Sequence, residues 1–108
     1  MHTLTDSLSR LRTTIAARRS ADPDISYIAK LFRKGRKKMA QKVGEEAVEV
    51  AIAAVRDDTK ELISESADLL FHLMVLWEDA GITPQDVGDE LTRREEISGL
   101  TEKKNRLS

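Results

Sequence analysis

Two long stretches of the chain, residues 37–55 and 60–80, repeat their apolar residues with a helical period, and only a short polar segment separates them. That segment, residues 57–59, has the composition of a turn, and Asp58 with Glu61 three residues later resembles a capping box. Two helices joined by so short a connection pack antiparallel. The sequence therefore predicts an all-α fold organised around a central antiparallel helical hairpin.

Shorter helices flank the hairpin on both sides. Leucine and isoleucine at helical spacing predict a helix over residues 5–20, and Ser26 is placed to cap a short helix over residues 27–32. A Thr-Pro pair opens another helix over residues 84–97, because proline is favoured at the first helical position. Together with the hairpin, these segments predict about five helices.

The domain organisation follows from where these elements stop. Gly35 lies inside a basic run and predicts a break before the third helix. The segment after residue 97 is polar, and neither a strand pattern nor an internal repeat is evident. We expect one all-α domain over residues 1–97, followed by a polar C-terminal tail over residues 98–108.

Composition and charge exclude several classes of protein. Eighteen Lys and Arg against 19 Asp and Glu give a net charge of −1, which provides no global field for nucleic acid. The chain has no cysteine and therefore no thiolate zinc site. Its longest apolar run, residues 69–77, is too short to cross a bilayer, and residues 1–20 lack the apolar core of a signal peptide. We expect a cytoplasmic protein that binds neither nucleic acid nor a membrane.

Carboxylates interrupt the apolar sequence of both hairpin helices. Residues three apart share a helix face, so Glu46 pairs with Glu49 and Glu65 pairs with Asp68. Packed together, the two pairs would repel each other without a counter-ion, and magnesium commonly bridges carboxylates to phosphate oxygens. The alternative is that the acids are ordinary solvated positions, which suits Glu45 at the start of a helix equally well. For the others the pattern favours metal-assisted phosphate chemistry.

A basic segment immediately precedes the first acidic helix. Seven of the thirteen residues from 30 to 42 are Lys or Arg. Such a run is often only a solvated surface. The functional interpretation is that some of these side chains hold substrate phosphates, and Lys42, one helical turn before the acids, is the first choice. Lys38 and Arg36 are the further candidates for this phosphate contact.

Apolar residues occur on nearly every side of the two hairpin helices. Glu49 is the only polar residue between Ala47 and Val55. A helix that is apolar all round is expected to be buried, and a chain of 108 residues has little else to cover two of them. We therefore expect a homodimer. His72, on the same stripe as Asp68, is either a metal neighbour or, more commonly for a lone histidine, a core residue that hydrogen-bonds a neighbour.

Extended motifs surround these acids. The chain carries Glu45-Glu46-x-x-Glu49 and, after fifteen intervening residues, Glu65-x-x-Asp68. This signature resembles that of the all-α nucleoside triphosphate pyrophosphohydrolase superfamily. The strings over residues 27–32, 41–49 and 65–73 narrow the resemblance to the phosphoribosyl-ATP pyrophosphatase family, and it extends over residues 4–97.

The resemblance implies an activity and a set of roles. It implies magnesium-dependent hydrolysis of phosphoribosyl-ATP to phosphoribosyl-AMP and pyrophosphate, the second step of histidine biosynthesis. It also implies a homodimer in which two hairpins form a four-helix bundle. Carried over by position, the metal-binding residues are Glu46, Glu49, Glu65 and Asp68, and Glu45 is the residue that could orient the attacking water.

Two alternatives remain open at this stage. A house-cleaning pyrophosphohydrolase, acting on free or damaged nucleoside triphosphates, would use the same five acids. A protein of another class, a non-catalytic helical assembly module, would use them only for solubility and pairing. The acids that lie inside apolar runs, Glu49 and Asp68, argue against the second alternative.

Overall fold

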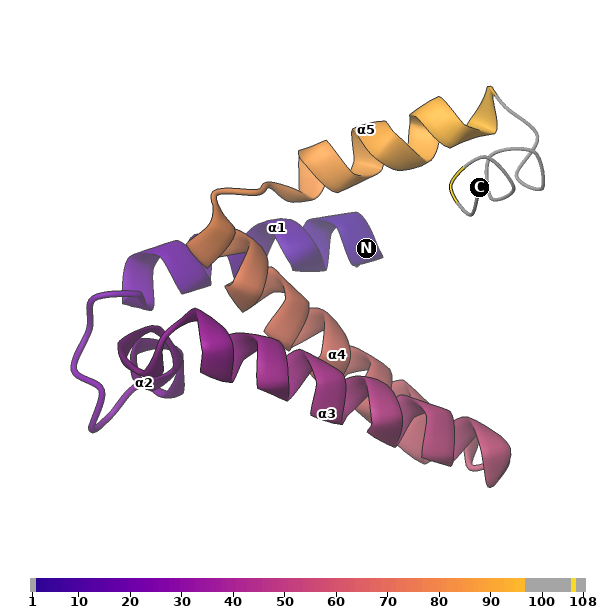
Figure 1. Ribbon diagram of the computed structural model, residues 1–108, viewed down its shortest axis with the longest axis horizontal. Coiled ribbons are helices and arrows are strands. Elements are labelled where there is room, and N and C mark those ends of the chain that lie inside the picture. Colours follow the sequence, from indigo (N-terminus) through magenta and orange to yellow (C-terminus); the bar gives the residue numbers. More distant parts are fainter. Residues whose placement is uncertain (1, 97–105, 107–108) are drawn as a thin grey trace.

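The computed structural model describes residues 2–96 and Arg106, and this part of the chain folds into five helices with no strand. Every predicted helix is present, with ends within two residues of those expected, so the all-α prediction is confirmed. The tail predicted over residues 98–108 lies, apart from Arg106, outside the described residues. The helices are α1 Leu4–Arg18, α2 Tyr27–Lys34, α3 Arg36–Val55, α4 Thr59–Ala80 and α5 Pro84–Glu95 (Figure 1).

Helices α3 and α4 form the predicted antiparallel hairpin and lie side by side (Figure 1). Three residues connect them, and the middle one, Asp57, has a left-handed backbone with φ of 58°. The Asp58 carboxylate accepts a hydrogen bond of 3.0 Å from the backbone N–H of Glu61. This bond satisfies one of the free N–H groups in the first turn of α4, and it therefore fixes where the helix begins.

Helices α2 and α3 meet at a single residue, Gly35. Its φ of 91° lies in the region that favours glycine. Its N–H donates to the carbonyl of Leu31 in α2, while its own carbonyl accepts from Met39 in the first turn of α3. At the start of α2, Ser26 Oγ accepts from the N–H of Ala29 at 3.2 Å, as the sequence predicts. One helix thus ends and the next begins in a new direction within one residue (Figure 1).

The hydrophobic core lies where α1, α2 and the adjoining ends of α3 and α4 meet. Each of the four helices contributes a side chain that is at most 2% exposed: Ile15, Leu31, Met39 and Val75. Trp77 packs against this cluster. The core is therefore mainly aliphatic, and it anchors one end of the hairpin to the rest of the molecule.

Helix α5 is well capped at its start. Gly81 ends α4 in a left-handed conformation with φ of 74°. Thr83 Oγ1 then accepts from the N–H of Asp86, and the Asp86 carboxylate accepts from the N–H of Thr83. This reciprocal pair is a complete capping box and explains why the helix begins at Pro84.

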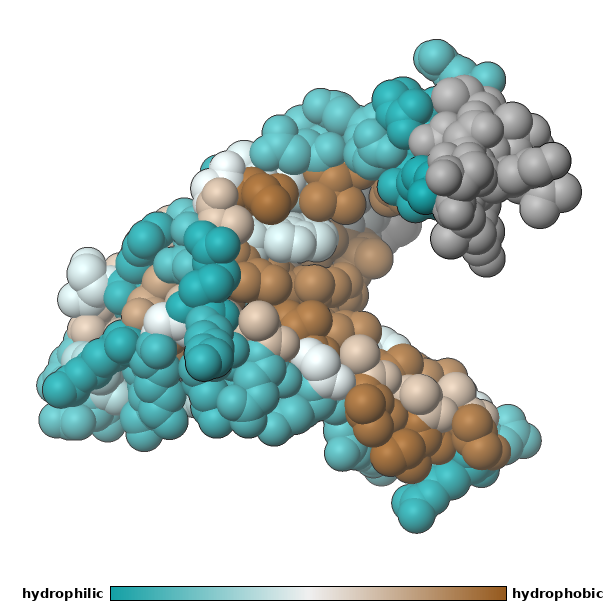
Figure 2. Space-filling model, in the orientation of Figure 1, coloured by the Kyte–Doolittle hydropathy of each residue, from teal (hydrophilic) through white to brown (hydrophobic). Residues whose placement is uncertain are grey.

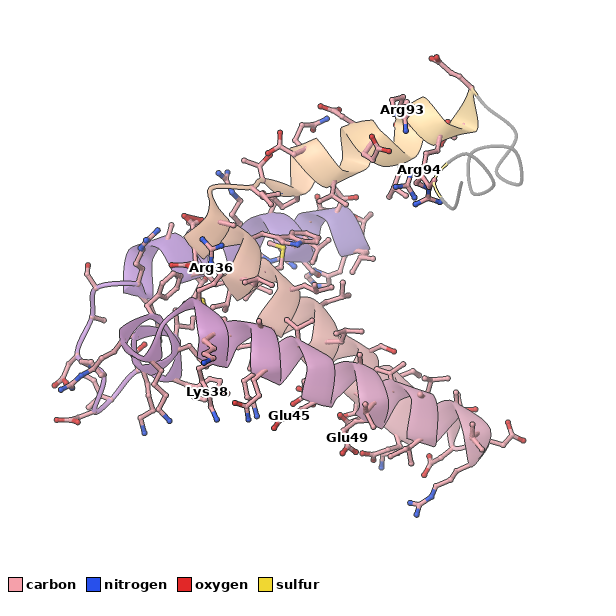
Figure 3. All side chains as sticks on the ribbon, in the orientation of Figure 1. Arg36, Lys38, Glu45, Glu49, Arg93 and Arg94 are labelled. Atoms are coloured by element: carbon pink, nitrogen blue, oxygen red, sulfur yellow. The ribbon has the colours of Figure 1, made fainter. Side chains whose placement is uncertain are left out.

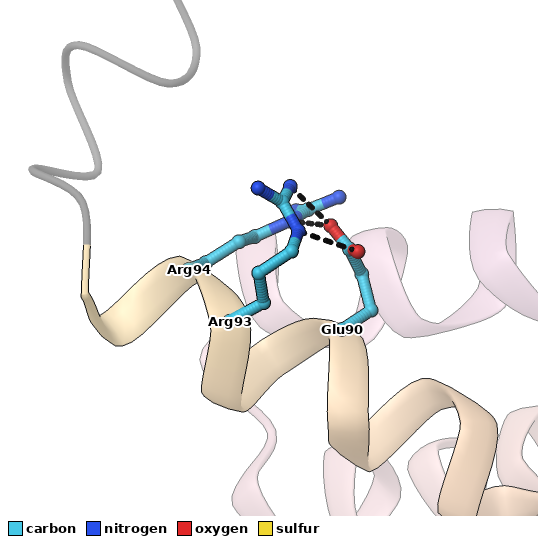
Figure 4. Close-up of polar contacts among 3 residues, drawn as sticks. All are labelled: Glu90, Arg93 and Arg94. Atoms are coloured by element: carbon cyan, nitrogen blue, oxygen red, sulfur yellow. Dashed lines mark hydrogen bonds and ion pairs between the residues drawn. The ribbon is translucent and has the colours of Figure 1, made fainter.

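The far end of α5 carries a group of charged side chains. Glu90 accepts hydrogen bonds from Arg93 at 2.8 and 3.0 Å and from Arg94 at 2.9 Å (Figure 4). The hydrogen bonds from the two guanidinium groups lower the pKa of Glu90 to about 2. No residue of α5 is buried, so these pairs support the helix locally and add little to the stability of the whole fold.

The free end of the hairpin exposes apolar side chains. We call residues 47–68, the second half of α3 and the first half of α4, the hairpin tip. Val48, Ile52, Val55 and Ile63 of this tip are 57, 41, 88 and 67% exposed, and Figure 2 shows a hydrophobic area there. None of the helices in the described ranges is both long and apolar enough to span a membrane.

Candidate metal centre

Three carboxylates converge between the two helices of the hairpin. Glu46 from α3 meets Glu65 and Asp68 from α4, and one oxygen of each lies within 4.8 Å of the other two. Glu65 and Asp68 are three residues apart on one face of α4, as their spacing predicts. Oxygen ligands at this separation suit a small, hard cation such as magnesium or calcium. The residues present therefore fit a divalent metal site.

Glu65 has a perturbed acidity within this group. Its pKa is raised to about 7, chiefly by a hydrogen bond with the carboxyl group of Glu61, and further by partial burial, a bond with Glu46 and the charge of Asp68. Two carboxyl groups can share a hydrogen bond only when one of them carries a proton. The neighbouring carboxylates therefore repel one another enough to favour a proton on Glu65, and a bound cation would relieve the same repulsion.

Glu49, which the sequence also predicts to bind metal, lies outside this group of three oxygens. It is exposed in the single chain, and it lies along the same side of α3 as Glu45 (Figure 3). It lines a cavity of about 190 Å³ toward the hairpin turn, together with side chains from the ends of both helices. The other lining residues are Ile52, Ala53, Arg56, Asp58 and Glu61.

Lys42 is the base closest to the acids. Its ammonium lies 3.5 Å from Glu45 and 3.9 Å from Glu46. Partial burial lowers the pKa of Lys42, but the nearby oxygens of Tyr27, Glu45 and Glu46 raise it, and the net shift is upward. Lys42 is therefore a permanent positive charge at the edge of the carboxylate group, where a phosphate would meet it.

Glu45 shares Lys42 with Glu46, one of the three converging acids. It accepts a hydrogen bond of 3.0 Å from the side-chain amide of Gln41. That bond, together with the bond and charge of Lys42 and the charge of Lys38, lowers the pKa of Glu45. Lys38 and Glu45 lie on the same side of α3 in Figure 3, so the two line one approach to the acids.

Arg36 is placed differently from the other predicted phosphate ligands. Its guanidinium forms an ion pair with the Asp79 carboxylate and also donates to the Asp79 carbonyl at 3.2 Å. Asp79 lies eleven residues beyond Asp68 on α4, roughly 16 Å along the helix axis. In this arrangement Arg36 ties the start of α3 to the end of α4, and a phosphate contact requires it to leave Asp79.

An aromatic cluster adjoins the acids on the side of Lys42. His72 is buried, and its ring lies edge-on against Tyr27 at 6.0 Å and Phe71 at 5.1 Å between centroids. The expected hydrogen bond to a neighbour is absent for Nδ1, which has no partner in the described part of the chain. Burial lowers the pKa of His72 despite the nearby charges of Glu46 and Asp68.

Two neighbours of the acids have no assigned role in the sequence pattern. Glu61 lies four residues before Glu65, and that helical spacing was the available signal. Tyr27 begins one of the strings that carry the family resemblance, but the sequence gives it no role beside the acids, because it reaches them only through the packing of α2 on the hairpin. A larger cavity of about 390 Å³, between α1 and the start of α5, has no acid among its described lining residues and therefore offers no carboxylate ligand for a metal.

Comparison with known proteins identifies closely similar sequences. A family model described as phosphoribosyl-ATP pyrophosphohydrolase matches residues 8–95. The chain is 58% identical over 101 residues to the phosphoribosyl-ATP pyrophosphatase of Azospirillum brasilense, covering 94% of this chain and 91% of that protein. The protein of the same name from Rhizorhabdus wittichii is 58% identical over 100 residues, covering 93% and 94%. That from Paramagnetospirillum magneticum is 56% identical over 99 residues, covering 92% and 91%.

Proposed function

The chain belongs to the phosphoribosyl-ATP pyrophosphohydrolase family, and we propose that it hydrolyses phosphoribosyl-ATP at the carboxylate group of Glu46, Glu65 and Asp68. The reaction yields phosphoribosyl-AMP and pyrophosphate and is the second step of histidine biosynthesis. These products require water to attack one of the two phosphorus atoms of the α–β phosphoanhydride, so that the bond from that phosphorus to the bridging oxygen breaks and the other phosphate leaves with that oxygen. The observation that carries the location is the convergence of three carboxylate oxygens beside the ammonium of Lys42.

Magnesium is the proposed cofactor, with Glu46, Glu65 and Asp68 as its protein ligands and Glu49 as a fourth. When bound, such an ion neutralises charge on the phosphates and increases the acidity of a coordinated water. The donor set is all oxygen, which magnesium prefers, and it leaves room for phosphate oxygens and water. Glu49, exposed and one helical turn from Glu46, has the freedom to turn toward the group.

Glu45 is the proposed residue that orients the attacking water. Its lowered pKa keeps the carboxylate ionised at neutral pH, so it is able to accept a proton from water. The hydrogen bond from Gln41 and the ion pair with Lys42 restrict its orientation. A phosphate that drew Lys42 away would free one Glu45 oxygen at the same time.

The substrate phosphates are proposed to contact Lys42 first, then Lys38 and, after it leaves Asp79, Arg36. Lys42 already pairs with two carboxylates, so it is positioned without a substrate. Arg36 has the longest way to move because its partner Asp79 is near the other end of α4. We rank the three contributions in that order.

Assembly into a homodimer is part of the proposal. The exposed apolar residues of the hairpin tip are what a symmetric copy would cover, and two paired hairpins give a four-helix bundle. The cytoplasm is the proposed location, which suits a chain without cysteine.

Pyrophosphate release from phosphoribosyl-ATP, measured with magnesium and with a chelator, tests the proposal. We expect turnover only with the metal, and much slower release from ATP and other plain triphosphates. Faster release from plain triphosphates would instead indicate a house-cleaning enzyme, and no release from any of them would favour an assembly module. Magnesium should also raise the melting temperature of the parent more than that of Glu49→Gln, because a ligand that binds only the folded state stabilises it.

A further inference from the structure

The exposed ring of Tyr27 lies at one end of the proposed site with two other rings behind it. Tyr27 is half exposed, while Phe71 is partly buried and His72 is buried. The Tyr27 and Phe71 rings are stacked at 20° with centroids 6.1 Å apart, and His72 is nearly perpendicular to both. Three rings in this geometry hold one another in place. Tyr27 therefore presents a flat surface whose orientation is set before a ligand arrives.

No other aromatic side chain in the protein offers such a surface near the acids. The sequence has one Tyr, two Phe and one Trp, apart from histidine. Phe32 is covered by the guanidinium of Arg19, 4.8 Å from its ring centroid, and both Phe32 and Trp77 pack against the hydrophobic core. Tyr27 is thus the aromatic residue available to a ligand at this site.

The chemical groups follow a definite order along the site. The Tyr27 ring packs against His72, and its hydroxyl is close enough to Lys42 to raise the pKa of that side chain. The Lys42 ammonium lies 3.9 Å from Glu46, which leads to the other acids. The anionic cavity lined by Glu49 and Glu61 lies beyond them. A nucleotide has the same order of parts: a planar base, a sugar, and phosphates that suit first a base such as lysine and then a metal.

We propose that the ring of Tyr27 is the surface on which the adenine of the substrate stacks, with its phosphates directed past Lys42 to the carboxylates. This inference rests on the proposed function, because it takes the substrate to be a nucleotide. Stacking of a base on an aromatic side chain strengthens binding by about 5- to 150-fold and tolerates differences in the edge of the base. It therefore suits an adenine that carries a second ribosyl group.

The single tyrosine of the chain makes a direct test simple. In the magnesium-loaded protein, the NMR signals of a labelled tyrosine ring report on Tyr27 alone. A purine stacked on the ring shifts those signals upfield, whereas a sugar phosphate does not. We expect AMP to produce this shift and ribose 5-phosphate to leave the signals nearly unchanged. Unchanged signals with AMP, or equal shifts with both probes, would overturn the inference.

A pair of variants gives a second, independent measurement. By calorimetry, Tyr27→Leu should weaken AMP binding by about tenfold while pyrophosphate binding stays the same, and Tyr27→Phe should retain the AMP affinity of the parent. Circular dichroism confirms that both variants fold. Unaltered AMP binding by Tyr27→Leu, or an equal loss for AMP and pyrophosphate, would contradict a stacking role.

The outcomes separate this inference from the proposed function. If the parent releases pyrophosphate from phosphoribosyl-ATP but AMP leaves the tyrosine signals unmoved, the stacking surface is wrong and the activity stands. If AMP shifts the signals but the parent releases no pyrophosphate, Tyr27 still binds a purine and the assigned reaction is wrong.

Discussion

The two ends of the α3–α4 hairpin have the same secondary structure and similarly apolar sequences, yet their surroundings differ. At the core end, Met39, Met74 and Val75 are at most 3% exposed. At the hairpin tip, Val55 and Ile63 are 88 and 67% exposed. The difference arises because α1 and α2 cover only the first of these ends, as Figure 1 shows.

This difference in burial along the hairpin bears on the position of the proposed metal ligands. The converging carboxylates lie at the inner edge of the hairpin tip: Glu65 and Asp68 belong to the tip, and Glu46 directly precedes it. The core end is packed on every side, while the tip leaves the acids accessible and carries the apolar surface that the proposed dimer would bury. Substitutions confined to the acids, to the core end or to the hairpin tip should therefore have separable effects.

The largest expected effect comes from removing charge at the acids. Glu49→Gln and Asp68→Asn should each reduce pyrophosphate release by at least about a hundredfold, because even residues that only support metal ligands cost up to about that much. A steady-state pyrophosphate assay at saturating magnesium measures it. Glu78→Gln makes the same change at the core end of α4, where Glu78 pairs with Arg19, and should stay near parental activity. Retention of activity within a few-fold by either site variant would show that it is not a ligand.

The next effect concerns stability and probes the core end. Leu31→Ala removes a side chain that is 2% exposed and should lower the free energy of unfolding by about 2–5 kcal/mol. Leu4→Ala, on a residue that is 62% exposed, is the matched control and should change it by no more than about 0.5 kcal/mol. Urea titrations followed by circular dichroism give both values, and similar losses for the two would mean that the core has been misplaced.

A change at the hairpin tip should act on assembly instead. Ile63→Glu places a charge on the apolar surface, and burying it against a partner should weaken dimerisation by at least about tenfold. Ile25→Glu, at a loop residue that is 85% exposed and distant from the tip, is the control. Sedimentation over a range of concentrations measures the dissociation constants. If the parent is a fully active monomer, the proposed dimer is wrong.

The smallest expected effect is a pH dependence that originates at the inner edge of the hairpin tip. The pKa of Glu65 is about 7 in the folded protein and near 4.5 in the unfolded chain, so the folded state binds this proton more tightly. Its contribution to stability is complete below about pH 4.5 and is lost as the pH rises through about 7. With a chelator present, urea titrations should show this loss in the parent and a smaller one in Glu65→Gln. Parallel pH profiles would exclude Glu65 as the source.

The sequence alone predicted the helices well because local chemistry determines their ends. Ser26, Asp58 and Thr83 cap the helices that they precede, and Gly35 and Gly81 end the helices that they follow. These signals act within one turn of the chain, so no knowledge of the tertiary structure was needed.

The arrangement of the candidate site was predicted only in part. The pairing of Glu65 with Asp68 follows from spacing on one helix. The position of Glu49 outside the three-oxygen group depends on how α3 is rotated against α4, and the partner of Arg36 depends on which residue of α4 lies opposite it. The helical spacing of residues in the sequence determines neither the rotation of α3 against α4 nor the residue that lies opposite Arg36. The position of Tyr27, which comes from α2, is likewise a result of tertiary packing.

Helix α4 runs without a break through both regions, from Thr59 to Ala80, a length of roughly 33 Å. Its second half packs into the hydrophobic core through Met74 and Val75, and its first half carries Glu65 and Asp68. Because one continuous helix carries both groups, a change in how Met74 and Val75 pack would also move the carboxylates of Glu65 and Asp68. We therefore expect substitutions at Met74 or Val75, in the core, to weaken magnesium binding at the proposed site as well as the fold itself.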